Sequence, residues 1–224
     1  MKITLNKNQT VWFTSDLHLD HSNIIKYSNR KFLSAKDQEE FDFLKGKWDR
    51  SKYRISKEST DMMNDHIIDN INKFVKKDDI LFHLGDFTFA PKFSYRDTAR
   101  YFMDRINCEN VYNIWGNHDH REIEPLFKDC FSLVEVYIDN QLYVLCHYCM
   151  LTWNKSHHAS IQLYGHSHSN LEEFAETVMP GRKSIDVGID NAYKVLGEYR
   201  PFSHYEINEM MSKKKGHSTG DHHS

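Results

Sequence analysis

The sequence lacks several features that would place the protein in a specialised class. Its four cysteines are too few to staple a secreted scaffold of 224 residues, so we expect free thiols. No apolar stretch is long enough to span a bilayer, and residues 1–13 lack the continuous apolar segment of a secretory signal. We therefore expect a cytoplasmic protein that does not bind membranes.

The chain also lacks a strong net charge, internal repeats and linkers. A net charge of −3 gives no overall attraction to nucleic acid, so any bound anion must be held by a local site. The length lies within the range that one hydrophobic core can serve. We expect a single domain over residues 1–212 and a disordered tail over 213–224, where lysine, glycine, serine and histidine have nothing to bury.

Histidine, in contrast, is abundant, with fifteen copies. Five β-type runs, at residues 11–15, 80–84, 111–115, 142–146 and 161–164, each end where side chains with metal-binding chemistry begin. The residues that follow them are Asp16-Leu17-His18, Gly85-Asp86, Gly116-Asn117-His118-Asp119, His147 and Gly165-His166-Ser167-His168. If the five strands are neighbours, these side chains meet at one sheet edge, which is where open α/β sheets place their ligands.

Amphipathic segments alternate with the strand-like runs, which indicates an α/β fold with helices packed on the sheet faces. Residues 63–75 and 99–106 each carry one apolar face, so we expect one helix with its start at 59–61 and another after Ser94. Residues 203–206 have the spacing of a capping box, which predicts a short closing helix.

The motif residues together offer two carboxylates, one amide oxygen and four imidazoles: Asp16, Asp86, Asn117, His18, His147, His166 and His168. This is more than one ion needs and enough for two divalent ions. Two carboxylates leave such a site positive, so its natural guest is an anion, and phosphate esters fit. In two-metal sites the ions lie about 3.5–4 Å apart, deprotonate a shared water and stabilise negative charge on the phosphoryl oxygens.

The five motifs, in this order along most of the chain, resemble those of the calcineurin-like metallophosphoesterase superfamily. The opening stretch 16–27 and the late stretches 187–190 and 199–202 resemble the small bacterial and phage members. The resemblance implies an αββα sandwich, in which two mixed sheets lie between helical layers. We expect manganese, although this donor set also accepts iron, zinc, cobalt or nickel.

The resemblance also implies a role for each motif residue. One metal ion would be held by Asp16, His18 and His168, a second by Asn117, His147 and His166, with Asp86 bridging the two. His118 would contact the scissile phosphate and protonate the leaving group, a general-acid role that histidine suits. Asp119 would either orient His118 or lie at the surface.

Four residues outside these motif positions are further candidates for contacts near the metals or with substrate. His83 is expected to support a ligand rather than to be one, and His21 to orient a ligand or line the pocket. Lys155 and His157 follow His147 in a loop, where they would either touch the substrate phosphate or belong to a solvated surface.

Residues 34–57 form an insertion relative to the small bacterial members. The part from 45 to 57 is basic and contains Trp48 and Tyr53, a mixture suited to a phosphate backbone and base stacking. The alternative is a solvated helix that Phe41, Leu44 and Trp48 dock on the body. The oligomeric state is left open.

Three functions are therefore considered. The first is hydrolysis of a small phosphate ester, a nucleotide or related metabolite, and it is the one we favour. The second is nucleic-acid processing by the same site, as a nuclease or an end-trimming phosphatase. The third is a scaffold that has lost catalysis, which the presence of every expected ligand and of His118 argues against.

Overall fold

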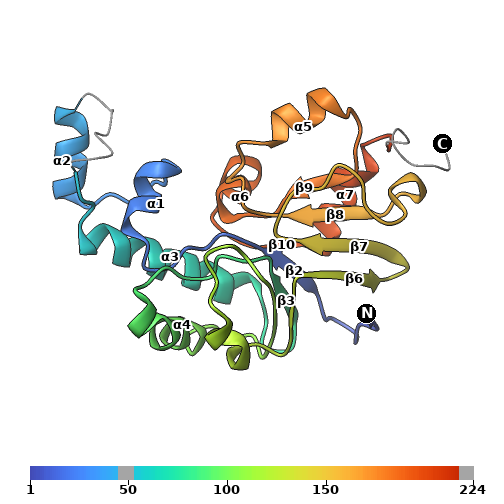
Figure 1. Ribbon diagram of the computed structural model, residues 1–224, viewed down its shortest axis with the longest axis horizontal. Coiled ribbons are helices and arrows are strands. Elements are labelled where there is room, and N and C mark those ends of the chain that lie inside the picture. The colour runs from blue at the N-terminus through green and yellow to red at the C-terminus, as the bar shows by residue number, and fades with distance from the viewer. Residues whose placement is uncertain (45–52, 217–224) are drawn as a thin grey trace.

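The computed structural model, described here for residues 1–44 and 53–216, contains two five-stranded sheets (Figure 1). The first has the order β10-β2-β3-β4-β5, and its strands are Phe202–Ser203, Val11–Thr14, Ile80–His83, Asn110–Ile114 and Cys130–Phe131. The second has the order β1-β6-β7-β8-β9, and its strands are Lys2–Ile3, Leu133–Ile138, Gln141–Cys146, Ile161–Tyr164 and Ser184–Asp186.

Both sheets are mixed. In the first, β2 to β5 run parallel and β10 pairs antiparallel with β2. In the second, β6 and β7 form an antiparallel hairpin, while β1, β8 and β9 pair in parallel. The hairpin turns at Asp139 and Asn140, which both have positive φ as a two-residue type I′ turn requires.

The main core lies between the two sheets. Phe13 on β2 and Phe82 on β3 stack with ring centroids 5.8 Å apart, and Phe13 also meets Tyr143 of β7 at 5.4 Å. Leu145 and Leu163, from β7 and β8, complete this layer and are fully buried. Because side chains alternate along a strand, Trp12 and Leu81 face the other way, toward the helices.

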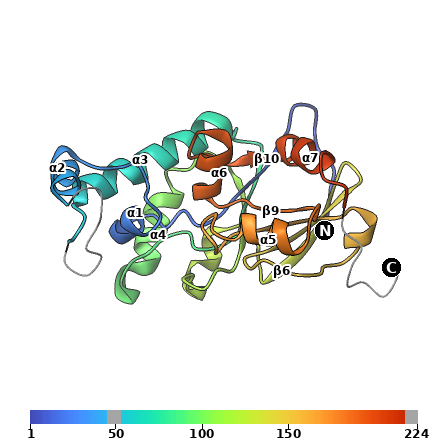
Figure 2. The same ribbon diagram turned by 90° about the horizontal axis from the view of Figure 1, so that it is seen from above.

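Helices flank the pair of sheets (Figures 1 and 2). Lys57–Phe74 (α3) and Tyr95–Met103 (α4) pack on the outer face of the first sheet, where Met63, Ile67 and Ile71 are fully buried. The remaining α-helices are Ser22–Tyr27 (α1), Ala35–Phe43 (α2), Glu172–Val178 (α5), Ile189–Leu196 (α6) and His204–Ser212 (α7). Short 3-10 turns occur at Lys92–Ser94, Arg121–Leu126 and Ser156–His158. The expected fold, an α/β protein with two mixed sheets flanked by helices, is confirmed.

Most of the expected elements are confirmed, with two corrections. Helix α3 begins one turn earlier than expected, because the Ser56 side chain, rather than residues 59–61, accepts the capping bond from the Ser59 amide. The five motif-bearing strands are not neighbours in one sheet. Three of them, β2, β3 and β4, belong to the first sheet, and β7 and β8 to the second. The predicted capping box is present at Ser203 and Glu206.

The two ends of the 34–57 segment are tied together by Asp37, which is fully buried. Its carboxylate accepts hydrogen bonds from the Tyr53 hydroxyl at 2.5 Å and from the Ser56 amide at 3.0 Å. Residues 45–52, which include Trp48 and most of the basic side chains, lie outside the described residues.

The end of the described chain is held against α5. Lys214 pairs with Glu176 at 3.0 Å, and the Gly216 amide donates to Gly181 O at 3.0 Å. Residues 213–216, expected to begin a disordered tail, therefore make contacts, and 217–224 lie outside the described residues. Within the part of the chain that the structure describes, no helix is both long and apolar enough to cross a membrane. All four cysteines are free thiols, as expected.

Candidate metal centre

The motif side chains converge where the carboxyl ends of β2, β3 and β4 meet those of β7 and β8. The loops that follow these strands are tightly wound. Five candidate ligands have positive φ values between 47° and 66°, which L-amino acids rarely adopt: Asp16, His18, Asp86, His166 and His168. Backbone strain of this kind persists where the surrounding structure enforces it, and it clusters at functional sites.

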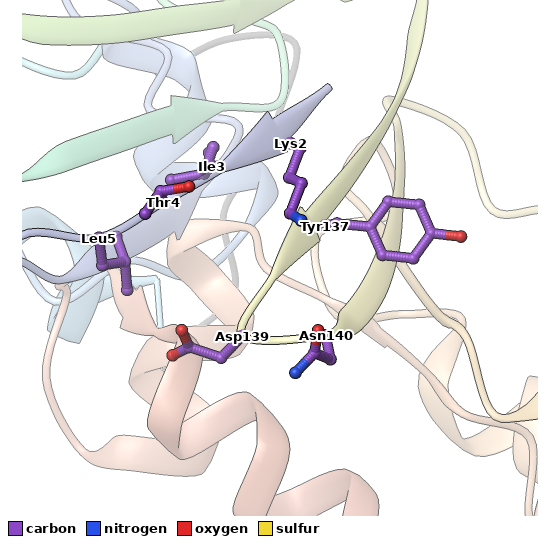
Figure 3. A pocket seen from close by; sticks show the side chains of 7 residues that line it. All are labelled: Lys2, Ile3, Thr4, Leu5, Tyr137, Asp139 and Asn140. Atoms are coloured by element: carbon purple, nitrogen blue, oxygen red, sulfur yellow. The ribbon is translucent and has the colours of Figure 1, made fainter.

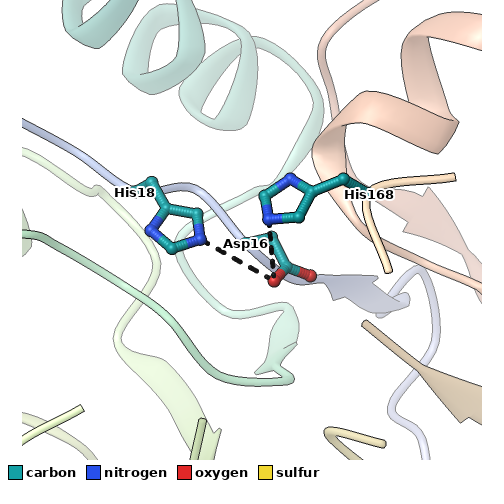
Figure 4. Close-up of side chains that lie close together, drawn as sticks. All are labelled: Asp16, His18 and His168. Carbon is teal, nitrogen blue, oxygen red and sulfur yellow. Dashed lines mark ion pairs between the residues drawn. The ribbon is translucent and has the colours of Figure 1, made fainter. Parts of the chain in front are cut away.

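The first group of ligand atoms belongs to Asp16, His18 and His168 (Figure 4). Asp16 Oδ1 lies 3.9 Å from His18 Nε2 and 3.8 Å from His168 Nε2. Asp16 and His18 are buried, whereas His168 is half-buried. Neither ring nitrogen of His18 has a hydrogen-bond partner, although both are buried. A buried imidazole without a partner is costly in a folded protein, so these three side chains fit a cation.

The second group belongs to Asp86, His147 and His166. Asn117 joins it, because its Oδ1 lies 3.0 Å from His147 Nε2 and 2.9 Å from His166 Nδ1. His147 Nδ1 donates to Leu84 O at 2.7 Å, which fixes the ring and turns Nε2 toward the site. Asn117 and His166 are exposed, so this group opens to solvent.

Asp86 connects the two groups. Its Oδ2 lies 3.5 Å from His18 Nε2 and also 3.5 Å from His147 Nε2. Its other oxygen, Oδ1, accepts a hydrogen bond from the His118 amide at 2.8 Å. One carboxylate oxygen thus lies between two imidazoles from different sheets. The two clusters are consistent with a dinuclear metal site.

The electrostatics of the groups also fit cations. Burial raises the pKa of Asp16 to about 7, against the lowering effects of His168 and His147. Burial lowers the pKa of His18 well below its usual value, with help from Arg30, and lowers that of His166. Neutral imidazoles are the form that binds metals, and a nearby divalent cation would favour an ionised Asp16.

A buried ion pair that the sequence did not reveal supports the first group. His168 Nδ1 donates to Asp190 Oδ2 at 2.7 Å, and Arg30 pairs with Asp190 at 2.8 Å. Arg30 also donates to the backbone carbonyls of Asp16 and Leu17, at 2.7 and 2.8 Å. Burial raises the pKa of Asp190, but Arg30 and His168 outweigh it and hold the pKa below its ordinary value. The ionised pair fixes both the His168 ring and the Asp16 backbone.

His118 lies over this centre without belonging to either group. Its ring centroid is 5.4 Å from that of His18, and the side chain is exposed. Asp119 has other partners. Its carboxylate accepts bonds from the amides of Asp86, Phe87 and Gly116, each at 3.0 Å. Asp119 thereby holds the turn that carries Asp86, and its carboxylate bonds to backbone amides, Tyr95 and Asn113 rather than to the His118 ring.

Two of the four further candidates, His21 and His83, lie close to the candidate metal centre. His21 lies near the candidate ligands, 5.5 Å from the His18 ring, and burial lowers its pKa to about 4. His83 is buried behind the site, where its Nδ1 donates to Asn113 Oδ1 at 2.9 Å. It lies outside both ligand groups, as expected.

Lys155 and His157 are not brought to the site. Lys155 Nζ donates to the Tyr137 hydroxyl at 2.9 Å, and Tyr137 pairs in register with Leu142 near the start of β7. Because β7 and β8 run parallel, the segment between them must return from the carboxyl edge to the amino edge of the sheet. The two side chains therefore lie at the edge opposite His147, a position that favours the solvated surface over contact with the substrate phosphate.

Two motif glycines leave room for the ligands. A Cβ at Gly165 would lie 2.0 Å from Ser15 Oγ and 2.3 Å from Asp16 Oδ2. At Gly85, which has a φ of +96°, it would lie 2.6 Å from His147 Nδ1. Any larger residue would displace a candidate ligand.

A separate hollow of about 580 Å³ lies at the amino edge, between β1 and the β6–β7 turn (Figure 3). Lys2, Leu5, Tyr137 and Asp139 line it, and their side chains do not converge on one point. Since it lies at the start of β7, it is not part of the candidate metal centre.

Comparison with known proteins agrees with this geometry. The model of the calcineurin-like phosphoesterase family matches residues 9–149, which is more than half of the chain. An uncharacterized protein of Methanocaldococcus jannaschii is 27% identical over 205 residues, covering 92% of this chain and 93% of that protein.

Among solved structures, a protein of unknown function from Aquifex aeolicus matches with a TM-score of 0.59 and 19% identity, covering 91% of this chain and all of that one. This likeness shows the fold. A phosphoesterase from E. coli matches 71% of this chain and 70% of its own at 17% identity, but its TM-score of 0.35 is too low to bear on function. The family match, together with the motif residues gathered at one centre, shows that the chain belongs to the calcineurin-like phosphoesterase family.

Proposed function

We propose that the protein is a metal-dependent phosphoric ester hydrolase whose substrate is a small phosphate ester, such as a nucleotide or a related metabolite. Asp16, His18 and His168 would hold one divalent ion, and Asn117, His147 and His166 the other. The observation that carries the proposal is the position of Asp86 Oδ2, 3.5 Å from an imidazole nitrogen of each group. A carboxylate so placed is suited to bridging two ions.

When bound, two such ions would supply an activated water and positive charge for the phosphoryl oxygens. The chain supplies the rest. His118, exposed above the ligands, is placed to donate a proton to the departing oxygen. Asp119 keeps the Asp86 turn in place, and the Asp190–Arg30 pair keeps His168 in place.

In the described part of the basic segment, the nucleic-acid alternative has the exposed Arg54 and little else. Lys57 pairs with Asp61 at 2.6 Å, and the Tyr53 hydroxyl is directed to Asp37. Lys45, Lys47, Arg50 and Lys52 lie outside the described residues. A small ester therefore stays the preferred substrate, and the net charge of −3 agrees with it.

The experiment that tests the proposal is a turnover panel with Mn²⁺. It compares an aryl phosphate monoester and diester, nucleoside monophosphates and cyclic phosphates, and short RNA and DNA. We expect turnover of small esters with little dependence on salt. Preference for RNA or DNA would instead support the polymer substrate, and the logarithm of the binding constant should then fall steeply with the logarithm of the salt concentration.

Asp190→Asn is expected to weaken the binding of one of the two ions by about 10- to 100-fold, the usual effect of removing a group that orients a metal-binding histidine. Asparagine is chosen because its side-chain oxygen can still accept a hydrogen bond from Arg30, which alanine cannot, although both changes remove the charge that pairs with Arg30. Calorimetric titration with Mn²⁺ gives the two affinities, and the melting temperature reports folding.

The matched control for this change is Asp65→Asn, which removes a carboxylate that is 59% exposed and paired with Arg105. It should leave both affinities unchanged. Equal affinities in Asp190→Asn and the unsubstituted protein would show that Asp190 does not position His168.

A further inference from the structure

Phe89 is an exposed aromatic side chain at the rim of the candidate metal centre. It lies three residues after Asp86, and 41% of its surface is exposed. Its ring stacks on His21, with centroids 4.0 Å apart and planes 19° apart. It also meets the ring of His118 edge-on at 5.7 Å. Phe89 therefore lies next to His118, the side chain that we propose donates a proton to the leaving group.

The position of Phe89 is fixed by the same loops that carry the candidate ligands. Its amide donates to Leu19 O at 2.8 Å, and the Leu19 amide donates to Phe87 O at 3.1 Å. The Thr88 hydroxyl donates to Leu19 O at 2.7 Å. These bonds join the 86–89 loop, which carries the ring, to the 16–19 loop, and the ring itself packs on His21. A side chain held in this way presents its exposed surface to substrate without a large loss of freedom.

An apolar ring at this place calls for an explanation. The surrounding site is built for charge, with carboxylates, imidazoles and an expected phosphate. The rings of His18, His21 and Phe89 form a row with successive centroids 5.5 and 4.0 Å apart, along which the side chains pass from buried through half-buried to exposed. Its outermost member, Phe89, is the apolar one. Exposed apolar surface beside a polar site marks a place where an apolar part of a ligand binds.

We propose, on the basis of the function proposed above, that Phe89 is a stacking platform for the leaving group and that the substrates are esters whose leaving group carries a planar aromatic ring. Such rings offset-stack or pack edge-on against phenylalanine. A nucleobase attached through a sugar and an aryl ring attached directly to the ester oxygen share this chemistry. Phe89 is accordingly a specificity residue, and it holds no metal ion.

The test compares kcat/KM of the Mn²⁺-loaded protein for three monoesters: AMP, phenyl phosphate and glycerol phosphate. Stacking on an aromatic side chain is worth about 1–3 kcal/mol per base, so Phe89→Ala should lower kcat/KM for the planar substrates by about 5- to 150-fold. Glycerol phosphate should change by less than about 2-fold. Phe89→Tyr, which keeps the ring, should retain most of the activity.

A larger loss for AMP would identify a nucleobase as the stacked group, and a larger loss for phenyl phosphate a ring on the ester oxygen. Phe93→Ala is the matched control, since Phe93 comes four residues later and is 90% exposed. It should change none of the three values. Metal content and melting temperature establish that each variant keeps its ions and its fold. Equal losses on all three esters in Phe89→Ala, or no loss on any, would overturn the proposal.

The failure of the proposed function can be recognised separately. If the unsubstituted protein hydrolyses none of the three esters, the hydrolase assignment fails. The stacking is then measured as equilibrium binding of AMP and of glycerol phosphate to the Mn²⁺-loaded protein. Weaker binding of AMP alone in Phe89→Ala supports the platform, and unchanged binding of AMP contradicts it.

Discussion

Asp86→Asn is expected to release both metal ions and to reduce turnover to the background of the metal-free protein. The change removes the charge of the one carboxylate whose oxygen lies 3.5 Å from an imidazole nitrogen of each ligand group. No other described side chain occupies this shared position, so neither group can replace it. Metal analysis after dialysis and the rate with a small ester measure the two effects together.

The control is Asp61→Asn, which removes a carboxylate that is 46% exposed and paired with Lys57. This variant should keep two ions and a normal rate, because exposed pairs of this kind contribute little. If Asp86→Asn retained two ions and a near-normal rate, the bridging assignment would be wrong.

His118→Ala is expected to keep both ions and to lose about 10²–10⁴ in rate, which is the usual contribution of a positioned general acid. The ring of His118 lies 5.4 Å from that of His18 and does not belong to either ligand group. The loss should shrink for a nitrophenyl ester, because nitrophenolate departs without a proton, and it should be full for an alkyl ester. Rates for both esters, with metal content, make the comparison.

The control is His158→Ala, since His158 is exposed at the amino edge, away from the centre. It should match the unsubstituted protein on both esters. Equal losses on the two esters in His118→Ala would indicate that His118 positions the phosphate and is not the proton donor.

The motif residues could be placed from the sequence because each directly follows a strand-like run. A strand that ends at Thr14 or His83 sets the direction of the chain, and the ligands follow within a few residues. The division of those strands between two sheets could not be predicted in the same way. Whether β7 and β8 extend the sheet of β2 or form a second sheet depends on packing between residues about 130 positions apart. The local hydrophobic pattern carries no information about such contacts.

The supporting residues were missed for a related reason. Arg30 and Asp190 are 160 residues apart, and the sequence shows each only as a charged residue near apolar ones. An expectation of surface exposure is the natural reading of such residues, because buried charges are rare unless paired. The resemblance of the stretch 187–190 to the small bacterial and phage members is the signal that points to Asp190.

Lys155 and His157 show a different limit. Nearness in sequence to His147 left contact with substrate open beside a solvated surface, and the loop after β7 must cross back to begin a parallel strand, which the sequence does not show. A short distance in sequence from a candidate ligand indicates nearness in space only within the part of the loop that lies at the same edge of the sheet. Phe89 satisfies that condition, three residues after Asp86, and was overlooked because a phenylalanine carries no metal-binding signal.

The most direct test of the central claim is a titration of metal-free protein with Mn²⁺, in which bound ions per chain and turnover of a small phosphate ester are measured on the same samples. Two ions held around one shared carboxylate predict that binding saturates at about two per chain and that turnover rises with the second ion. Saturation at one ion per chain, or full turnover with no metal bound, would contradict the account.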